Sequence, residues 1–272
     1  MRQMTDFVAR AVIALATLVA LGAHDRSSAA NATTAQAVPL RSCAPDSGRP
    51  AGSLCGTVAV PENRTLKGSR QIALNVVVLP ARSGNGHGNP IFGLAGGPGI
   101  GSTRLAIRYP RLYDTLQAEH DIVLVDQRGI GASQPLVCAA TDYTKQLGKV
   151  FDQLPDSRTL AACRDRLAKQ ADLMQYTTTA AVEDLDAVRQ ALGYSRINLF
   201  GVSYGTRVAL KYLRRHEPNV RAIAVSGVFS AAYRIGVHGP AESQHALQQL
   251  FAMCAADTFR SDVDSPRSWP HV

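Results

Sequence analysis

Several features that would assign this 272-residue chain to other classes of protein are missing. The formal net charge is +8, yet no run of Lys and Arg is longer than the pair Arg214 and Arg215, and aromatic residues do not alternate with the basic ones. Nucleic-acid surfaces gather basic and stacking side chains on one face. We therefore expect no nucleic-acid partner and interpret the charge as an aid to solubility. The chain has no internal repeats.

The five cysteines contain no C-x-x-C pair and no histidine at the spacing of a metal ligand. This argues against a zinc site, and we expect neither a metal nor a cofactor. The cysteines of an exported protein usually form disulfides, because the compartment outside the cytoplasm is oxidising. Short separations favour Cys43 with Cys55 and Cys138 with Cys163, although sequence alone does not fix the connectivity. Cys254 is left unpaired.

The first residues have the pattern of a secretory signal. Two arginines precede an apolar run over residues 11–23, which is too short to span a bilayer comfortably. Small residues at 28–30 and at 35–37 both fit a cleavage site, and both stay open. We expect residues 1–37 to be removed on export, with no stable membrane span left in a secreted or periplasmic protein. The alternative is an N-terminal membrane anchor.

Strands that alternate with helices predict an α/β fold with a mostly parallel sheet and helices on both faces. The length and the 46% hydrophobic content fit one catalytic domain, with its core at 38–239 and a helix and irregular tail at 240–272. The expected strands are 57–60, 71–80, 90–94, 121–126, 197–200 and 221–228. The expected helices are the segment after the glycine-rich loop up to about residue 119, broken at Pro110, then 157–172, 181–192 with Gly193 as its C-cap, the segment after residue 203, and 240–256.

The strongest chemical signal lies at residues 196–216. An apolar strand leads through the turn GVSYG at 201–205 into a helix with one apolar side. This is the pattern of a nucleophile elbow, in which a strained turn exposes the serine hydroxyl. Gly201 and Gly205 would let the strand and the helix pass closely. We predict Ser203 as the nucleophile; the alternative is a tight structural turn with an idle serine.

Three motifs in this order resemble the α/β-hydrolase superfamily, and within it the prolyl aminopeptidases and secreted tripeptidyl aminopeptidases. They are Gly96-Gly97-Pro98-Gly99 after the third strand, Asp126-Gln127-Arg128-Gly129 after the fourth, and Gly201-Val202-Ser203-Tyr204-Gly205 after the fifth. The resemblance extends from about residue 55 to about residue 257. It implies that Ser203 attacks a carbonyl and forms an acyl-enzyme.

The resemblance also implies roles for the neighbours of Ser203. The backbone N–H groups of Tyr204 and Gly97 would form an oxyanion hole, because donors fixed to the backbone stabilise developing negative charge without reorganising. Gly96, Pro98 and Gly99 would shape the loop around Gly97. Asp126 and Arg128 are expected to organise loops rather than to react.

The superfamily pattern is incomplete after residue 228. It requires an acid and then a histidine after two further strands, but no apolar strand precedes Asp257, Asp262 or Asp264. His271 is the penultimate residue, and chain ends fray, so we do not expect Asp264 and His271 to work as a dyad.

The other histidines near this end also lack the setting of a base. We expect His216 on the surface at the end of the elbow helix, and His238 and His245 where relatives begin a cap domain. We interpret 240–256 as the first cap helix. Our hypothesis is that the chain is a C-terminally shortened version of a longer one, with the last strands and most of the cap missing.

The leading functional hypothesis is a secreted serine hydrolase that cleaves short or N-terminal proline-type peptides, a substrate choice that the resemblance implies. An esterase of small esters is the nearest alternative. From another class comes an inactive pseudo-hydrolase or ligand-binding fragment, favoured by the missing acid and histidine. Epoxide-hydrolase chemistry is disfavoured because such relatives attack with an aspartate where this chain has Ser203. The partner would be a small peptide or ester, and the sequence is silent on oligomeric state.

Overall fold

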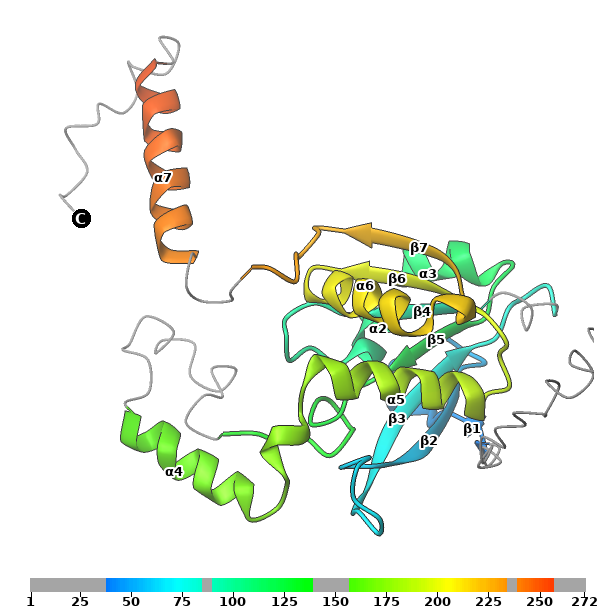
Figure 1. Cartoon of the computed structure of the whole chain (residues 1–272). Coiled ribbons are helices and arrows are strands. Elements are labelled where there is room, and N and C mark those ends of the chain that lie inside the picture. The colour runs from blue at the N-terminus through cyan, green and yellow to red at the C-terminus, as the bar shows by residue number, and fades with distance from the viewer. Residues whose placement is uncertain (1–37, 85–89, 139–156, 234–238, 257–272) are drawn as a thin grey trace, which may run out of the picture. The chain divides into compact units, whose positions relative to one another are not determined.

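The computed structural model describes residues 38–84, 90–138, 157–233 and 239–256 (Figure 1). The expected signal segment, its cleavage sites and the membrane-anchor alternative lie outside the described residues. So do His238 and the tail with Asp257, Asp262, Asp264 and His271. No helix in the described part of the chain has both the length and the apolar character needed to cross a membrane.

The described strands form one mixed sheet in the order β1-β2-β3-β5-β4-β6-β7. Strands β5, β4, β6 and β7 run parallel, while β1, β2 and β3 are antiparallel to their neighbours. Their bounds are β1 Arg41–Ser42, β2 Leu54–Pro61, β3 Gln71–Leu79, β4 Ile91–Leu94, β5 Ile122–Val125, β6 Ile197–Val202 and β7 Val220–Ser226.

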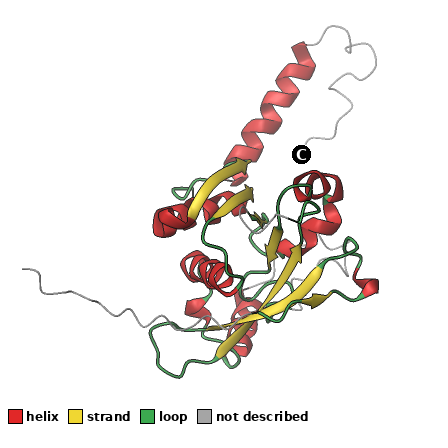
Figure 2. Cartoon of the chain, turned by 90° about the vertical axis from the view of Figure 1, so that its right-hand side faces the viewer, coloured by secondary structure: helices red, strands yellow, loops and turns green. Residues whose placement is uncertain are grey.

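Helices cover both faces of the sheet, as the sequence predicted (Figures 1 and 2). On one face, α5 and α6 pack side by side over alternate strand residues such as Val76 and Leu199. On the other, α2 and α3 cover Val77 and Leu124. The helices are α2 Leu105–Arg108, α3 Pro110–Gln117, α4 Ser157–Ala168, α5 Thr178–Ala191, α6 Tyr204–His216 and α7 Gly239–Ala256. Short 3-10 turns lie at Pro45–Ser47, Ser102–Arg104, Leu173–Gln175 and Glu217–Asn219.

Most boundaries fall within a few residues of the predicted ones, and the differences have local causes. Helix α5 begins at Thr178 because Thr177 caps it, its side chain accepting a hydrogen bond from the Ala180 N–H at 3.2 Å. Helix α4 ends at Ala168, short of the predicted 172, and the Asp172 side chain instead caps a following 3-10 turn. The C-cap of α5 is Leu192, one residue before the predicted Gly193, which follows it with φ 77°, the left-handed conformation that commonly ends a helix.

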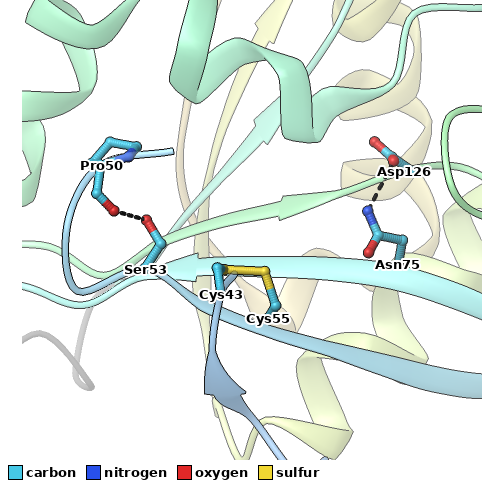
Figure 3. Close-up of a disulfide and its surroundings, with 6 residues drawn as sticks. All are labelled: Cys43, Pro50, Ser53, Cys55, Asn75 and Asp126. Carbon is cyan, nitrogen blue, oxygen red and sulfur yellow. Dashed lines mark hydrogen bonds between the residues drawn. A yellow bond between two sulfur atoms is a disulfide. The ribbon is translucent and has the colours of Figure 1, made fainter. Parts of the chain in front are cut away.

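Both expected disulfides are present. Cys43 is bonded to Cys55 and Cys138 to Cys163, with Cα–Cα distances of 5.0 and 5.8 Å. The first bond joins the chain after β1 to β2 (Figure 3). Cys254 is free and exposed on α7, whose large apolar side chains are exposed too: Leu247, Leu250, Phe251 and Met253.

Candidate active site

Ser203 connects β6 to α6 with φ 53° and ψ −121°, a backbone conformation that residues with a Cβ rarely adopt. Three hydrogen bonds hold it there. The Ser203 N–H donates to the Ser226 carbonyl at 2.9 Å, and the Ser203 carbonyl accepts from the Thr206 N–H at 2.9 Å and hydroxyl at 2.7 Å. Since Thr206 is fully buried while Ser203 is exposed, the fold fixes the backbone and leaves the serine side chain accessible.

The strand and the helix on either side of Ser203 pass too closely for larger residues. A Cβ on Gly201 would lie 2.7 Å from the Gly205 carbonyl oxygen. A Cβ on Gly205 would lie 2.2 Å from the carbonyl oxygen of Leu94, the last residue of β4. Only glycine fits at these two positions without moving the backbone.

The glycine-rich loop after β4 lies directly against Ser203. A Cβ on Gly96 would sit 3.0 Å from Ser203 Cβ and 3.4 Å from Ser203 Oγ. Gly97 and Gly99 have φ of 109° and 108°, which favours glycine at both, and the Gly97–Pro98 peptide is cis. Tyr204 is the first residue of α6, so its N–H has no acceptor within that helix. Both segments expected to supply oxyanion donors are therefore neighbours of the serine.

Asp126 holds the surrounding loops together. It is 2% exposed, and its carboxylate accepts from the Thr103 N–H at 3.0 Å and hydroxyl at 3.1 Å, the Ala132 N–H at 3.0 Å and the Asn75 amide at 3.0 Å (Figure 3). A Cβ on Gly131 would lie 2.3 Å from this carboxylate. With its lone pairs engaged and its surroundings filled, Asp126 has the contacts of a structural residue.

Arg128 forms a buried ion pair with Asp184 of α5. Its Nε and Nη2 each donate to one Asp184 oxygen at 2.7 Å, a bidentate geometry, and both side chains are 2% exposed. Its Nη1 donates to the Glu62 carbonyl at 2.7 Å and the Gln175 carbonyl at 3.1 Å. Arg128 thus joins the segment after β5 to α5 and to the end of β2.

Two further carboxylates belong to this scaffold and were not singled out from the sequence. Burial raises the pKa of Glu62, but hydrogen bonds from Arg70 and Tyr176 outweigh it and hold that pKa below its usual value. Burial likewise raises the pKa of Asp186, whereas hydrogen bonds from Arg189, Tyr212 and Gln190 lower it to about 2. For Asp186 the sequence offered one signal: Asp184 and Asp186 lie on either side of Leu185, an apolar residue of α5 that is buried.

No histidine of the described residues is hydrogen-bonded to Ser203. His245 on α7 contacts Gln249 at 3.1 Å. His120 precedes β5 and therefore lies at the opposite edge of the parallel strands from Ser203, which follows β6.

The expectation that His216 lies on the surface is wrong. Its side chain is 17% exposed, with nitrogens 3.5 Å from a Glu183 oxygen and 3.8 Å from an Asp186 oxygen. The Tyr212 ring packs against it with a centroid distance of 4.9 Å. The last turn of α6 lies beside α5, so His216 contacts α5 as well as the end of its own helix.

Among the described residues no cluster of three His, Cys, Asp or Glu could hold a metal ion.

The chain belongs to the α/β-hydrolase family. The family model described as "alpha/beta hydrolase fold" matches residues 89–265. This match confirms the fold class and the superfamily resemblance predicted from the three motifs.

Several relatives carry peptidase names. The chain is 30% identical over 202 residues to the serine protease Hip1 of Mycobacterium tuberculosis, covering 70% of this chain and 38% of that protein. It is 29% identical over 205 residues to a tripeptidyl aminopeptidase of Streptomyces lividans, covering 68% and 37%. A solved proline iminopeptidase of Mycobacterium smegmatis aligns with a TM-score of 0.37 and 19% identity over 61% of this chain and 42% of that one. The chain thus spans under two fifths of the length of these two curated relatives.

Proposed function

We propose that this chain is a serine hydrolase that uses Ser203 as its nucleophile. The observation that carries the proposal is the backbone of Ser203, held at positive φ by hydrogen bonds to Ser226 and to the buried Thr206 while its side chain stays accessible. Strain of this kind persists only where the surroundings enforce it, and it gathers at active sites. The family membership and the peptidase names of the relatives support the same reaction class.

In this reaction the Ser203 oxygen attacks a substrate carbonyl carbon while its proton passes to a general base, which later returns it to the leaving group; no described histidine is hydrogen-bonded to Ser203 to fill this role. The carbonyl oxygen takes up negative charge, which the backbone N–H groups of Tyr204 and Gly97 stabilise. Collapse of the tetrahedral intermediate expels the protonated leaving group and leaves an acyl-enzyme, which water hydrolyses. Asp126 and Arg128 take no part in the proton transfers; they hold the loops around the serine.

For the substrate we propose short peptides cleaved near the N-terminus, with proline-type peptides as the first choice. The support is the names of the relatives, tripeptidyl aminopeptidase and proline iminopeptidase. Export is part of the proposal, since both disulfides need an oxidising compartment to persist. Small esters are the alternative substrate, because ester and amide hydrolysis share the acyl-enzyme.

A fluorophosphonate probe tests the nucleophile, since it labels only an activated serine. We expect labelling of the purified chain at Ser203, found by peptide mapping, and none in Ser203→Ala. Ser195→Ala is the matched control, because Ser195 is exposed in the turn before β6, at the other end of that strand. Turnover of alanyl and prolyl p-nitroanilides against p-nitrophenyl esters then separates peptidase from esterase.

A second candidate is a non-catalytic ligand-binding form of the fold. It is favoured by one observation, that no histidine of the described residues is hydrogen-bonded to Ser203. If the folded chain is neither labelled nor turns over any amide or ester, this candidate replaces the hydrolase.

A further inference from the structure

The glycine-rich loop that carries one of the expected oxyanion donors needs support from outside itself. It runs from Gly96 to Gly101 and contains four glycines among six residues. Glycine loses more conformational freedom on folding than any other residue, so a loop of this composition does not fix its own backbone. An oxyanion hole works only if its N–H donors already point to the place where charge develops. Contacts outside the loop must therefore fix the direction of the Gly97 N–H.

Ser102, the first residue after this loop, joins its two ends. The Ser102 Oγ accepts a hydrogen bond from the N–H of Ala95, the residue before the loop, at 3.1 Å. Ala95 and Ser102 are each 1% exposed, so water does not compete for this bond. Without the Ser102 oxygen, the Ala95 N–H would be left buried and without this acceptor, which is unfavourable. The bond therefore holds the start and the end of the loop together.

Ala95 is in turn fixed against the elbow. A Cβ on Gly205 would lie 2.8 Å from the Ala95 carbonyl oxygen, so this carbonyl packs on the first turn of α6. Leu94, the residue before Ala95, pairs with Gly201 of β6. Ala95 thus has its carbonyl against α6 and its N–H bonded to Ser102. The Ser102 hydroxyl connects the far end of the loop to the elbow through this one residue.

The residue after Ser102 is anchored on the other side. The Thr103 N–H and hydroxyl donate to the Asp126 carboxylate at 3.0 and 3.1 Å. A Cβ on Gly101 would lie 2.6 Å from an oxygen of the same carboxylate. Ser102 therefore lies between two fixed points, Asp126 and Ala95. Removing its hydroxyl would free the loop from Ala95 and leave the bonds to Asp126 in place.

We propose that Ser102 is a positioning residue of the oxyanion hole. Its Oγ holds the Ala95 N–H and thereby keeps the Gly97 N–H directed at the carbonyl oxygen that gains negative charge when Ser203 attacks. Ser102 is too buried to touch a substrate, so it acts through the loop. The inference rests on the proposed hydrolase function and adds to it a residue outside the three sequence motifs.

Hydrolysis of p-nitrophenyl acetate and of alanyl p-nitroanilide by the 272-residue chain tests this role. Ser102→Ala should lower kcat by about tenfold or more, because small displacements of a catalytic group are costly in rate. KM should change by less than about threefold, since the oxyanion hole acts on the transition state more than on the bound substrate. Fluorophosphonate labelling should slow by about the same factor as kcat, since the phosphonyl oxygen needs the same donors. Burst titration counts the active sites, so a smaller folded fraction is not mistaken for a lower kcat.

Ser53→Ala is the matched control, because Ser53 is also a buried serine whose hydroxyl is bonded to the backbone. Ser53 is 4% exposed and donates to the Pro50 carbonyl at 2.5 Å. It precedes β2, which begins at the same end of the sheet as β5 and β6, whereas Ser203 follows the last residue of β6. Urea denaturation should show comparable losses of stability in the two variants, but kcat should fall only in Ser102→Ala. Unchanged kcat and labelling in Ser102→Ala, or equal falls in both variants, would overturn the inference.

A second substitution at Ser102 covers the case in which Ser102→Ala does not fold, which circular dichroism would show. Ser102→Cys keeps a side chain of similar size with a weaker hydrogen-bond acceptor, so its kcat and labelling rate should also fall. The two proposals fail in different ways. If the unaltered chain is neither labelled nor active, the hydrolase proposal fails and this inference fails with it. If the unaltered chain is active and the folded Ser102 variants are equally active, the inference alone fails.

Discussion

The hydroxyl groups of Thr178 and Tyr204 lie 2.7 Å apart, so the first residue of α5 is hydrogen-bonded to the residue that follows Ser203. Both side chains are partly buried. Helix α5 is itself bonded through Asp184 to Arg128. The strained turn is therefore supported from the neighbouring helix as well as by its own strand and helix.

Removing the Thr178 hydroxyl and removing the Tyr204 hydroxyl should have non-additive effects on the free energy of unfolding. Thr178→Val and Tyr204→Phe should each lower the free energy of unfolding by about 1 kcal/mol, the usual net value of such a hydrogen bond. The double variant should cost about as much as one single variant, since the same bond is lost. Urea denaturation measures all three, and strictly additive losses would show that the two hydroxyls do not interact.

Gly96→Ala should impair the site more than the fold. The added methyl would lie 3.0 Å from Ser203 Cβ, so the loop or the serine must shift. We expect labelling by the fluorophosphonate to slow by about tenfold or more, because a misplacement of about 1 Å can cost about a hundredfold in rate. Gly239→Ala is the control, since nothing lies within 4 Å of its Cβ position. Unchanged labelling in Gly96→Ala would refute the close approach.

Arg128→Met should destabilise the protein severely. It leaves the buried Asp184 carboxylate with Arg64 alone among its present partners, and breaking one side of a buried ion pair costs about 3–5 kcal/mol. Arg82→Ala removes the comparable but exposed pair with Asp114 and should cost about 0–1 kcal/mol. Thermal unfolding compares the stability of the two variants. If both lost a similar amount of stability, burial would not decide the cost of breaking these ion pairs.

Asp186 should make stability depend on acidic pH. Its pKa falls from 3.8 to about 2 on folding, so the unfolded chain binds more protons between these values and stability rises with pH there. The contribution, roughly 2 kcal/mol, is complete above pH 4 and is lost as pH falls through about 2. Asp186→Asn should flatten the profile of unfolding free energy over this range. Asp165→Asn, in an exposed ion pair, should leave it unchanged.

The fold was predictable where one segment carries its own signal. Residues 122–125 form an apolar run, and residues 197–200 are apolar except for Asn198, because their strands lie inside the sheet; that burial is visible without knowing the neighbours. The elbow was predictable for a similar reason, since a strand, a G-x-S-x-G turn and a helix are adjacent in sequence. The two-residue strand β1 was missed, because backbone pairing with β2 defines it and its side chains are exposed.

The scaffold of the site was harder to predict because its partners are distant in sequence. Asp184 is 56 residues from Arg128 and 120 from Arg64, so nothing local marks it as a buried ion-pair residue. His216 shows the same limit. Its place at a helix end suggested the surface, but the acids of α5 lie beside it.

Strand β7 pairs with β6 and with no other described strand, and its residues from Arg221 to Ser226 are mostly exposed. In a parallel pair, alternate residues direct their N–H groups toward the neighbour and the others direct them outward. In heavy water the outward amides should therefore take up deuterium quickly while the inward ones are protected. Any strand that came to lie along this edge would slow the outward set alone, so the isotope pattern of this single strand reports whether the sheet has been extended.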